Sequence, residues 1–501
     1  MLSKKDRICQ KIIEYGILGV IIFSPLPAAS VSDWSILVIQ LAVLIMMAAY
    51  FLMREKLQNN EFLSLSLRWP RYLFLGLFIF IALQIIPLPK FLVKFLSPNA
   101  YSFQELFALD FSKLKFISLS LIPSHTLRTG LELLSYFLLG FLIVNIVTRR
   151  YQIRRIFYVL IVMGVLEAFY GFFEFYNQNP RILFYRKTYY LDSVTGTFVN
   201  RNHFSGYLEM IIPLALGLII TRIDLFALSG LKWREKFLRL SEKGLATNIL
   251  LSLGVMAMSI AIIFSKSRTG AFLLVFTFIL FFALTTLYFG MAGSQRKWIK
   301  NFLHIIFLVV IIISLYIGIG ATLDRFALDQ LLQEQRPLYW ANTIGIFSEF
   351  PIFGAGLGTF PSIYPDYEQQ GTLVRIVHAH NDYLEYLAEL GVVGSLLLLG
   401  GILFVFVTSF LIWRLRRYPQ AKGLALGGII AVINILIHSV VDFNLHIPAN
   451  MVLFSVVLSL TVVIAFYKRR EDNKEKDTKV NLKIKLQKPG FQEHLNNEEN
   501  G

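Results

Sequence analysis

The chain consists of long apolar stretches separated by short polar ones. Windows of about 20 consecutive apolar residues, the length at which a helix crosses a bilayer, recur along most of it. They predict about twelve spans, near 12–30, 33–53, 70–88, 130–147, 155–176, 204–221, 246–264, 271–290, 302–320, 384–411, 424–441 and 449–467. The pattern therefore predicts an all-α, polytopic membrane protein.

The first residues, MLSKKDRICQK, precede an apolar stretch and so resemble a signal peptide. No small-residue cleavage site follows, and further spans come after it. We interpret this stretch as a retained first helix.

Composition agrees with a membrane protein, since 56% of the residues are hydrophobic and only 16% are charged. A net charge of +16 would also suit a nucleic-acid-binding protein. However, the basic residues lie in short loops between apolar spans, which favours membrane topology over nucleic acid as their explanation. The single cysteine, Cys9, excludes an intramolecular disulfide framework and a cysteine-based metal site.

Basic clusters fall in every second loop and so predict the orientation of the chain. They lie at 54–56, 68–71, 149–155, 232–243, 295–300, 414–422 and 468–470. Twelve spans then place both termini in the cytoplasm, together with a basic, disordered tail at 468–501.

The alternate loops, predicted to be external, hold most of the unusual polar motifs. They are 89–129, 177–203, 265–270, 321–383 and 442–448. This distribution predicts a functional face directed outwards, towards the periplasm if the cell has one.

The long external loop, 321–383, is expected to be folded. RPLYWANTIGIFSEF, from Arg336, predicts an amphipathic helix. In PIFGAGLGTF, Gly354, Gly356 and Gly358 would let the backbone approach a ligand, or would simply form a structural turn.

The motif HAHNDYLEYLAELGVVG, 378–394, carries two histidines and three carboxylates at the start of a span. Asn381 is a good helix N-cap, so His380 lies just ahead of the positive end of a helix, which favours a neutral imidazole suited to general-base catalysis. Asp382, Glu385 and Glu389 are spaced by three and four and share one helix face. The alternative is that His378 and His380 are interfacial polar residues with satisfied hydrogen bonds.

Three further motifs lie at predicted external span ends. GTFVNRNHFSGYLEM contains Arg201, Asn202 and His203, SKSRTG contains Lys266 and Arg268, and HSVVDFNLHIP contains His438, Asp442 and His446. Positive charge on the external side opposes the usual bias, and arginine suits bidentate phosphate binding. The alternative is an Arg268 side chain that extends to lipid headgroups.

A zinc site formed by His378, His380 and Asp382 is a further hypothesis. Their spacing matches no strong metal motif, and no cysteines assist them. The sequence therefore favours a site without metal or cofactor.

HNDYLEYLAELGVVG resembles the signature of the O-antigen ligase and polymerase superfamily: His-Asn, nine residues, Gly, two residues, Gly. His380, Asn381, Gly391 and Gly394 fit that spacing, and Glu389 matches the family's Glu-x-Gly. GTFVNRNHFSGYL, SKSRTG, RPLYW with FGAGLGTF, and VDFNLHIPAN resemble further blocks in the family's order, so the resemblance covers about residues 190–460.

This resemblance implies a glycosyltransferase C-like membrane fold. It divides the chain into N-terminal helices at 1–190, an O-antigen ligase-like domain at 191–467 with the periplasmic loop 321–383, and the cytoplasmic tail. It also implies metal-free transfer of a glycan from undecaprenyl diphosphate to an acceptor hydroxyl, in the cell inner membrane and among its lipids.

Carried over by motif, the resemblance makes His380 the catalytic histidine, while Arg268 and Arg201 hold the diphosphate. Arg336 is a further candidate for holding the diphosphate, and Asn202, Lys266, Asn381 and Glu389 complete the set of substrate-binding candidates.

The acceptor separates the remaining interpretations. An O-antigen ligase would use lipid A–core, a polysaccharide polymerase a growing glycan, and a third variant a protein. A transporter of lipid-linked glycans is the non-enzymatic alternative, although the sequence shows neither a clear internal repeat nor charges at mid-depth.

Overall fold

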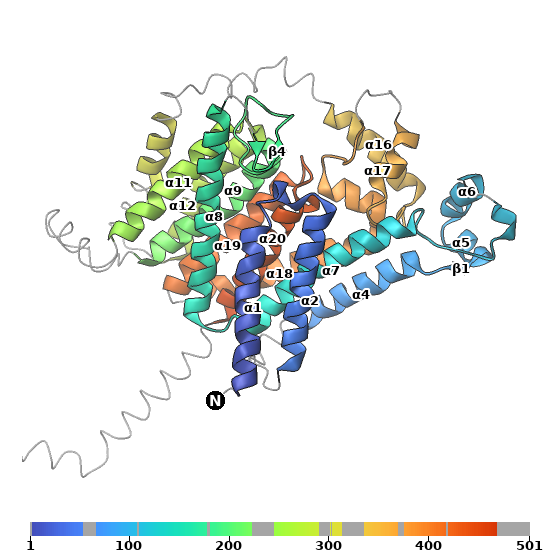
Figure 1. Ribbon diagram of the computed structural model, residues 1–501, viewed down its shortest axis with the longest axis horizontal. Coiled ribbons are helices and arrows are strands. Elements are labelled where there is room, and N and C mark those ends of the chain that lie inside the picture. The colour runs from blue at the N-terminus through green and yellow to red at the C-terminus, as the bar shows by residue number, and fades with distance from the viewer. Residues whose placement is uncertain are drawn as a thin grey trace, which may run out of the picture.

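A computed structural model of the chain shows helices running in several directions around a buried centre (Figure 1). The structure describes residues 3–53, 67–107, 110–177, 181–222, 245–289, 301, 303–312, 335–368, 375–416 and 419–467. The predicted tail at 468–501, the basic clusters at 54–56, 232–243 and 295–300, and residues 321–334 and 369–374 of the long loop lie outside them. Within these ranges the all-helical prediction is confirmed.

Ten of the described helices are long and apolar enough to cross a membrane. They are α2 (Asp33–Leu52), α4 (Arg68–Ile85), α7 (Pro123–Ile146), α8 (Arg150–Tyr176), α9 (Arg201–Arg222), α11 (Leu245–Phe264), α12 (Arg268–Tyr288), α18 (Asp382–Arg414), α19 (Pro419–His438) and α20 (Pro448–Tyr467). The chain is therefore a multi-pass membrane protein.

The predicted count of twelve is not confirmed, for two reasons. The first predicted span corresponds to α1 (Lys4–Phe23), whose first half is rich in charged residues and which is not among these ten helices. The ninth predicted span is described only as an apolar helix over Leu303–Ile312.

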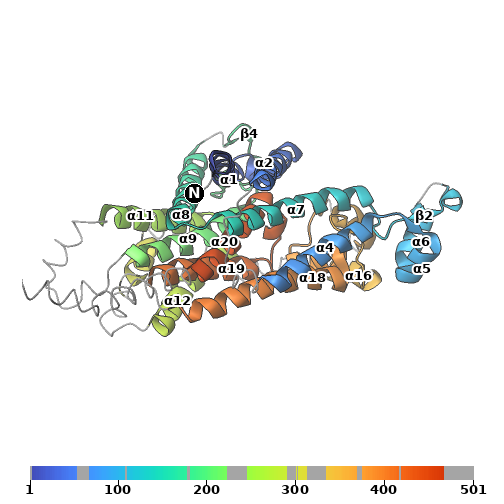
Figure 2. The ribbon, with the colours of Figure 1, turned by 90° about the horizontal axis from the view of Figure 1, so that it is seen from below.

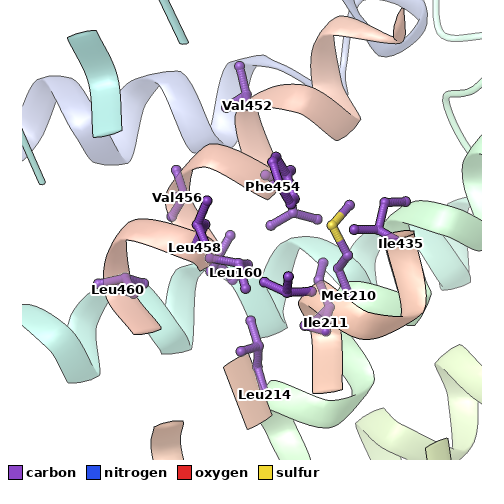
Figure 3. Packing of buried hydrophobic residues seen from close by; sticks show 14 of the residues in the cluster. Leu160, Met210, Ile211, Leu214, Ile435, Val452, Phe454, Val456, Leu458 and Leu460 are labelled. Carbon is purple, nitrogen blue, oxygen red and sulfur yellow. The ribbon is translucent and has the colours of Figure 1, made fainter. Parts of the chain in front are cut away.

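The buried centre is formed by α9, α19 and α20. Helix α9 packs against α19, α11, α8, α12 and α20, and α20 also packs against α7 and α18. Met210, Ile211 and Leu214 of α9 meet Ile435 of α19 and side chains of α20 (Figure 3). Because these apolar side chains are buried around α9, the polar start of that helix is held in a fixed place.

Close contact between α9 and α19 depends on glycine. A Cβ at Gly217 would lie 2.6 Å from the carbonyl oxygen of Gly423, and one at Gly427 would lie 2.5 Å from that of Pro213. Small residues that allow two backbones to approach are the usual basis of helix packing in membranes.

A smaller layer covers one end of the bundle (Figure 2). It contains α5 (Lys90–Leu96), α6 (Pro98–Phe107), α16 (Arg336–Glu349) and α17 (Phe360–Ile363), with the antiparallel pair β1 (Leu88–Pro89) and β2 (Phe116–Ile117). A second antiparallel pair, β3 (Arg181–Ile182) and β4 (Tyr185–Arg186), lies elsewhere, near α8 (Figure 1). The 3-10 turns are η1 (Ala28–Ser30), η2 (Phe111–Lys113), η4 (Tyr364–Tyr367) and η5 (Asn444–His446). Helix α16 confirms the helix predicted in the long loop and packs on α18, although its buried residues include Asn342 and Thr343.

Helix α18 is interrupted at Gly391, which has φ +60° and ψ −171°. The backbone of the glycine run lies directly against this break, since Gly356 N donates to the carbonyl of Glu389 at 2.9 Å. A Cβ at Gly354 would lie 2.2 Å from that same carbonyl oxygen. Gly354 therefore serves close packing against α18, while the Cβ positions of Gly356 and Gly358 lie against Ser120 and Thr129, and these contacts favour the structural interpretation over an approach to a ligand.

The first prediction concerns topology. In a chain with Cys9 replaced by serine, we introduce single cysteines at positions 185, 368, 235 and 297 and treat intact cells with a membrane-impermeant maleimide. The basic loops predict labelling at 185 and 368 and none at 235 and 297. Labelling at 235 together with protection at 368 would invert the orientation.

The second prediction concerns the break in α18. Gly391→Ala should destabilise the protein by at least about 1–3 kcal/mol, because alanine rarely adopts this backbone conformation and its Cβ would lie 2.3 Å from the carbonyl oxygen of Ile352. Gly400→Ala is the matched control on the same helix, since no atom lies within 4 Å of its Cβ position. The measurement is thermal unfolding in detergent, and equal melting temperatures for the two variants would contradict the prediction.

Candidate active site

Four segments distant in sequence meet at the carboxylate of Asp442, which is 1% exposed. Asn202 Nδ2 donates to Oδ2 at 2.6 Å, and Arg336 Nη2 does so at 3.2 Å. His380 Nδ1 lies 3.2 Å from Oδ1, and His203 Nε2 lies 3.5 Å from it. We call these five residues the Asp442 cluster.

Asp442 is held as an anion by this surrounding. Burial raises the pKa of its carboxyl, but hydrogen bonds from His203 and His380 and the charge of Arg336 outweigh burial and hold that pKa well below its ordinary value. A buried carboxylate without such partners would be strongly destabilising.

The backbone around His380 is fixed in a conformation that few residues adopt. Its φ is +52°, in the left-handed region. The indole Nε1 of Trp340 donates to its carbonyl at 3.2 Å, and the backbone N–H of Asp382 donates to the carbonyl of Ser439 at 2.9 Å. Residues held in this way are common at functional sites.

The predicted helix cap next to His380 is confirmed. Asn381 caps α18, since its side chain accepts from the N–H groups of Tyr383 and Leu384. The carboxylate within hydrogen-bonding distance of the imidazole is that of Asp442, with Nδ1 3.2 Å from Oδ1. With Nδ1–H donated to this carboxylate, Nε2 carries the free lone pair that a general base requires.

The carboxylates of α18 belong to a second group, the His446 cluster, formed by His378, Asp382, Glu385 and His446. His378 Nδ1 lies 2.7 Å from Glu385 Oε1, and His446 Nδ1 lies 2.6 Å from Asp382 Oδ1. Burial lowers the pKa of His446, but Glu385 and Asp382 outweigh burial and raise it to about 10.

The ring of Phe443 lies between the two clusters. It stacks on His378 with the ring centroids 4.2 Å apart, and it meets His380 edge-on at 4.7 Å and His203 at 4.4 Å. The two histidines of the HAH motif therefore belong to different environments, although one residue separates them in sequence.

A cavity of about 330 Å³ opens beside the His446 cluster. Its lining includes His125, Arg128, His378, Glu385, Glu389 and His446, together with apolar residues such as Leu357 and Met451. Glu389 is buried, and its Oε1 accepts from the backbone N–H of Phe360 at 3.0 Å. Its Oε2 makes no hydrogen bond within the described structure.

Arg201 and Lys266 are brought to the same segment, residues 190–194. The Arg201 guanidinium lies over the Tyr190 ring at 4.8 Å, and Lys266 forms an ion pair with Asp192 at 2.8 Å. Hydrogen bonding to Lys266 lowers the pKa of Asp192. The positive charge of Lys266 is thus already balanced, which weakens its candidacy as a phosphate ligand.

Arg268 is the first residue of α12 and is half-buried. Ser267 caps this helix by accepting from Gly270 N–H at 3.2 Å. A Cβ at Gly270 would lie 2.7 Å from Ser205 Cβ, so the first turns of α12 and α9 are in contact. The structure therefore places Arg268 and Arg201 on adjoining helix starts.

The remaining sequence candidates have structural partners. Asn202 and Arg336, expected to bind substrate, contact Asp442. Sequence reasoning placed Asp442 and His446 in a polar motif but assigned neither a role. The only signal for them was a polar motif at a predicted external span end.

These features define a polytopic helical membrane protein with a buried, ionisable site where several interhelical segments meet. Residues 253–399 match the family described as O-Antigen ligase, which supports a place for the chain in the O-antigen ligase superfamily. The matched segment includes Arg268, Arg336, His380 and Glu389, whereas Arg201 and Asp442 lie outside it. A comparison with curated proteins finds no match.

The third prediction concerns Asp442. Asp442→Ala should destabilise the protein by about 3–5 kcal/mol, because it removes a buried carboxylate that accepts from Asn202 and Arg336 and lies close to His380 and His203. Asp192→Ala is the matched control. It also removes the acid of an ion pair, with Lys266, but the side chain of Asp192 is 70% exposed. Unfolding in detergent measures both variants, and similar stabilities would show that Asp442 does not hold these segments together.

Proposed function

We propose that the protein transfers a glycan from an undecaprenyl-diphosphate carrier to an acceptor hydroxyl at the periplasmic face of the cell inner membrane. The observation that supports this most is the pairing of His380 Nδ1 with Asp442, which leaves Nε2 available as a base. The match of residues 253–399 to the O-antigen ligase family supports the general chemistry.

In the proposed reaction, His380 Nε2 accepts the proton of the acceptor hydroxyl while the hydroxyl oxygen attacks the anomeric carbon of the donor sugar. The bond between that carbon and the diphosphate oxygen breaks, and undecaprenyl diphosphate leaves with the bonding electrons. Asp442 stabilises the imidazolium that forms, so it acts as a positioning residue. The donor already carries its leaving group, and no nucleotide sugar is needed.

Arg268 and Arg201 are proposed to stabilise the charge that develops on the departing diphosphate. Their positions on adjoining helix starts support a shared role. Asn202 and Arg336, which contact Asp442, would act mainly by holding that carboxylate in place. We propose that the transfer step itself needs no metal ion.

The acceptor we favour is lipid A–core, which makes the protein an O-antigen ligase. A polysaccharide polymerase and a protein glycosyltransferase would use the same residues with another acceptor. Deletion of the gene followed by gel analysis of surface glycans separates the first two. Long free polymer without attachment indicates a ligase, and short unpolymerised units indicate a polymerase.

A transporter of lipid-linked glycans is less well supported. A transporter needs no oriented base, whereas the Asp442 cluster leaves His380 Nε2 free for proton transfer. Formation of a new glycosidic bond by purified protein would exclude pure transport.

The fourth prediction compares the two histidines of the HAH motif. A positioned general base contributes roughly 10²–10⁴ in rate, so His380→Ala should lower transfer by about that factor. His378→Ala should cost much less, because Phe443 separates it from the Asp442 cluster. The measurement is transfer in vitro from a lipid-diphosphate glycan at equal protein. Equal small losses would remove His380 from the mechanism, and a large loss only at His378 would transfer the role to that residue.

The fifth prediction concerns Arg268. Arg268→Lys retains the charge but loses the bidentate guanidinium, so transfer should fall strongly, and Arg268→Ala should lose more. Normal amounts of folded protein in both variants are the control. Full transfer by Arg268→Ala would leave lipid-headgroup contact as the explanation of this arginine.

A further inference from the structure

Three side chains of the His446 cluster converge on one point. Each of His378, Glu385 and His446 offers one nitrogen or oxygen atom, and the three atoms lie within 4.8 Å of one another. The residues come from three segments: the strand-like stretch before α18, the first turn of α18, and η5. Two imidazoles and one carboxylate form a ligand set found in zinc enzymes.

The orientation of His446 is the second, independent observation. Its Nδ1 lies 2.6 Å from Asp382 Oδ1, which fixes the ring and directs Nε2 towards Glu385 Oε1, 3.5 Å away. This Nε2 is buried and makes no hydrogen bond within the described structure. A histidine whose second nitrogen is held by a carboxylate is the usual arrangement around protein-bound metals.

Two of the three separations between ligand atoms are close to those around a small tetrahedral ion, and the third is within 4.8 Å. Metal–nitrogen bonds of about 2.0–2.1 Å place neighbouring tetrahedral ligand atoms roughly 3.3 Å apart. His446 Nε2 and Glu385 Oε1 are 3.5 Å apart, close to this value. His378 Nδ1 and Glu385 Oε1 are 2.7 Å apart, and this distance would increase by about half an ångström as the ion replaces the shared proton. Both rings are already supported, His378 by Phe443 and His446 by Tyr386, whose ring centroid lies 4.5 Å away.

We propose that His378, Glu385 and His446 bind a divalent transition-metal ion, with zinc the best match to this ligand set. Two imidazoles favour zinc, cobalt or nickel over magnesium and calcium, which prefer oxygen ligands. All three ligands line the cavity, so a fourth position is open to water or to a hydroxyl of a bound molecule. The ion would tie α18 to the two segments that carry the ligands.

This site differs from the zinc hypothesis based on the sequence, which grouped His378 with His380 and Asp382. His380 belongs to the Asp442 cluster on the other side of Phe443, and Asp382 supports His446 without being a ligand. The proposal does not depend on the proposed transfer reaction, because none of its three ligands belongs to the Asp442 cluster.

Direct metal binding tests the proposal. Full-length protein is purified in detergent with an affinity tag that contains no histidine, stripped with EDTA, dialysed and titrated with Zn²⁺ and Co²⁺. We expect a single equivalent to remain bound, a four-coordinate Co²⁺ absorption spectrum, and a higher melting temperature with Zn²⁺. Failure of the wild-type protein to retain either ion would overturn the proposal.

Variants locate the ion. Glu385→Gln and His446→Gln should abolish retention, and Asp382→Asn should weaken affinity by about 10–100-fold. His125→Gln is the matched control, because His125 lines the same cavity outside the ligand set, and it should bind as the wild type does. Unchanged retention in both ligand variants would place the ion elsewhere and overturn the proposal, even where one variant folds poorly.

The transfer assay separates this proposal from the proposed function. EDTA-treated protein should still transfer glycan while melting at a lower temperature. Loss of transfer that Zn²⁺ restores would contradict the metal-free mechanism but support the ion. Intact transfer by a protein that retains no metal would support the metal-free mechanism and overturn the proposed metal site.

Discussion

The buried carboxylate of Asp442 is the interaction on which the arrangement of the site depends. It receives donors from the start of α9, the start of α16 and the segment before α18, and it lies in the turn after α19. A buried anion is stable only with such partners, so each of these segments must reach it for the carboxylate to remain charged. The carboxylate that holds these segments together also orients the imidazole of His380.

The helix packing makes this convergence possible. Glycines let α9 and α19 approach closely, which brings Asn202 and Asp442 within hydrogen-bonding distance. The interruption of α18 at Gly391 admits the backbone of the glycine run, and that run leads into the layer that carries α17. The same packing places Phe443 between an oriented imidazole and a group of histidines and carboxylates with different partners.

Much of the local structure could be predicted from the sequence, because it depends on neighbouring residues. Apolar stretches predicted the long helices, and Asn381 predicted the start of α18 correctly. The partners of the ionisable groups could not be predicted in this way. Asp442 and His380 are 62 residues apart, and Asn202 and Asp442 are 240 apart. Their pairing depends on how whole helices pack, which periodicity does not describe. For the same reason the sequence did not show that the carboxylates of α18 contact His378 and His446, or that Asp192 pairs with Lys266.

A double-mutant cycle between His380 and Asp442 tests the central claim most directly. Transfer rates are measured for His380→Ala, Asp442→Asn and the double variant, at equal amounts of protein that unfolds cooperatively. If Asp442 acts through the imidazole, Asp442→Asn lowers the rate by about 10²-fold or more in the wild-type background and causes no further loss when His380 is absent. Losses that multiply in the double variant would show that the two residues act independently, and would contradict the account of His380 as a base oriented by this carboxylate.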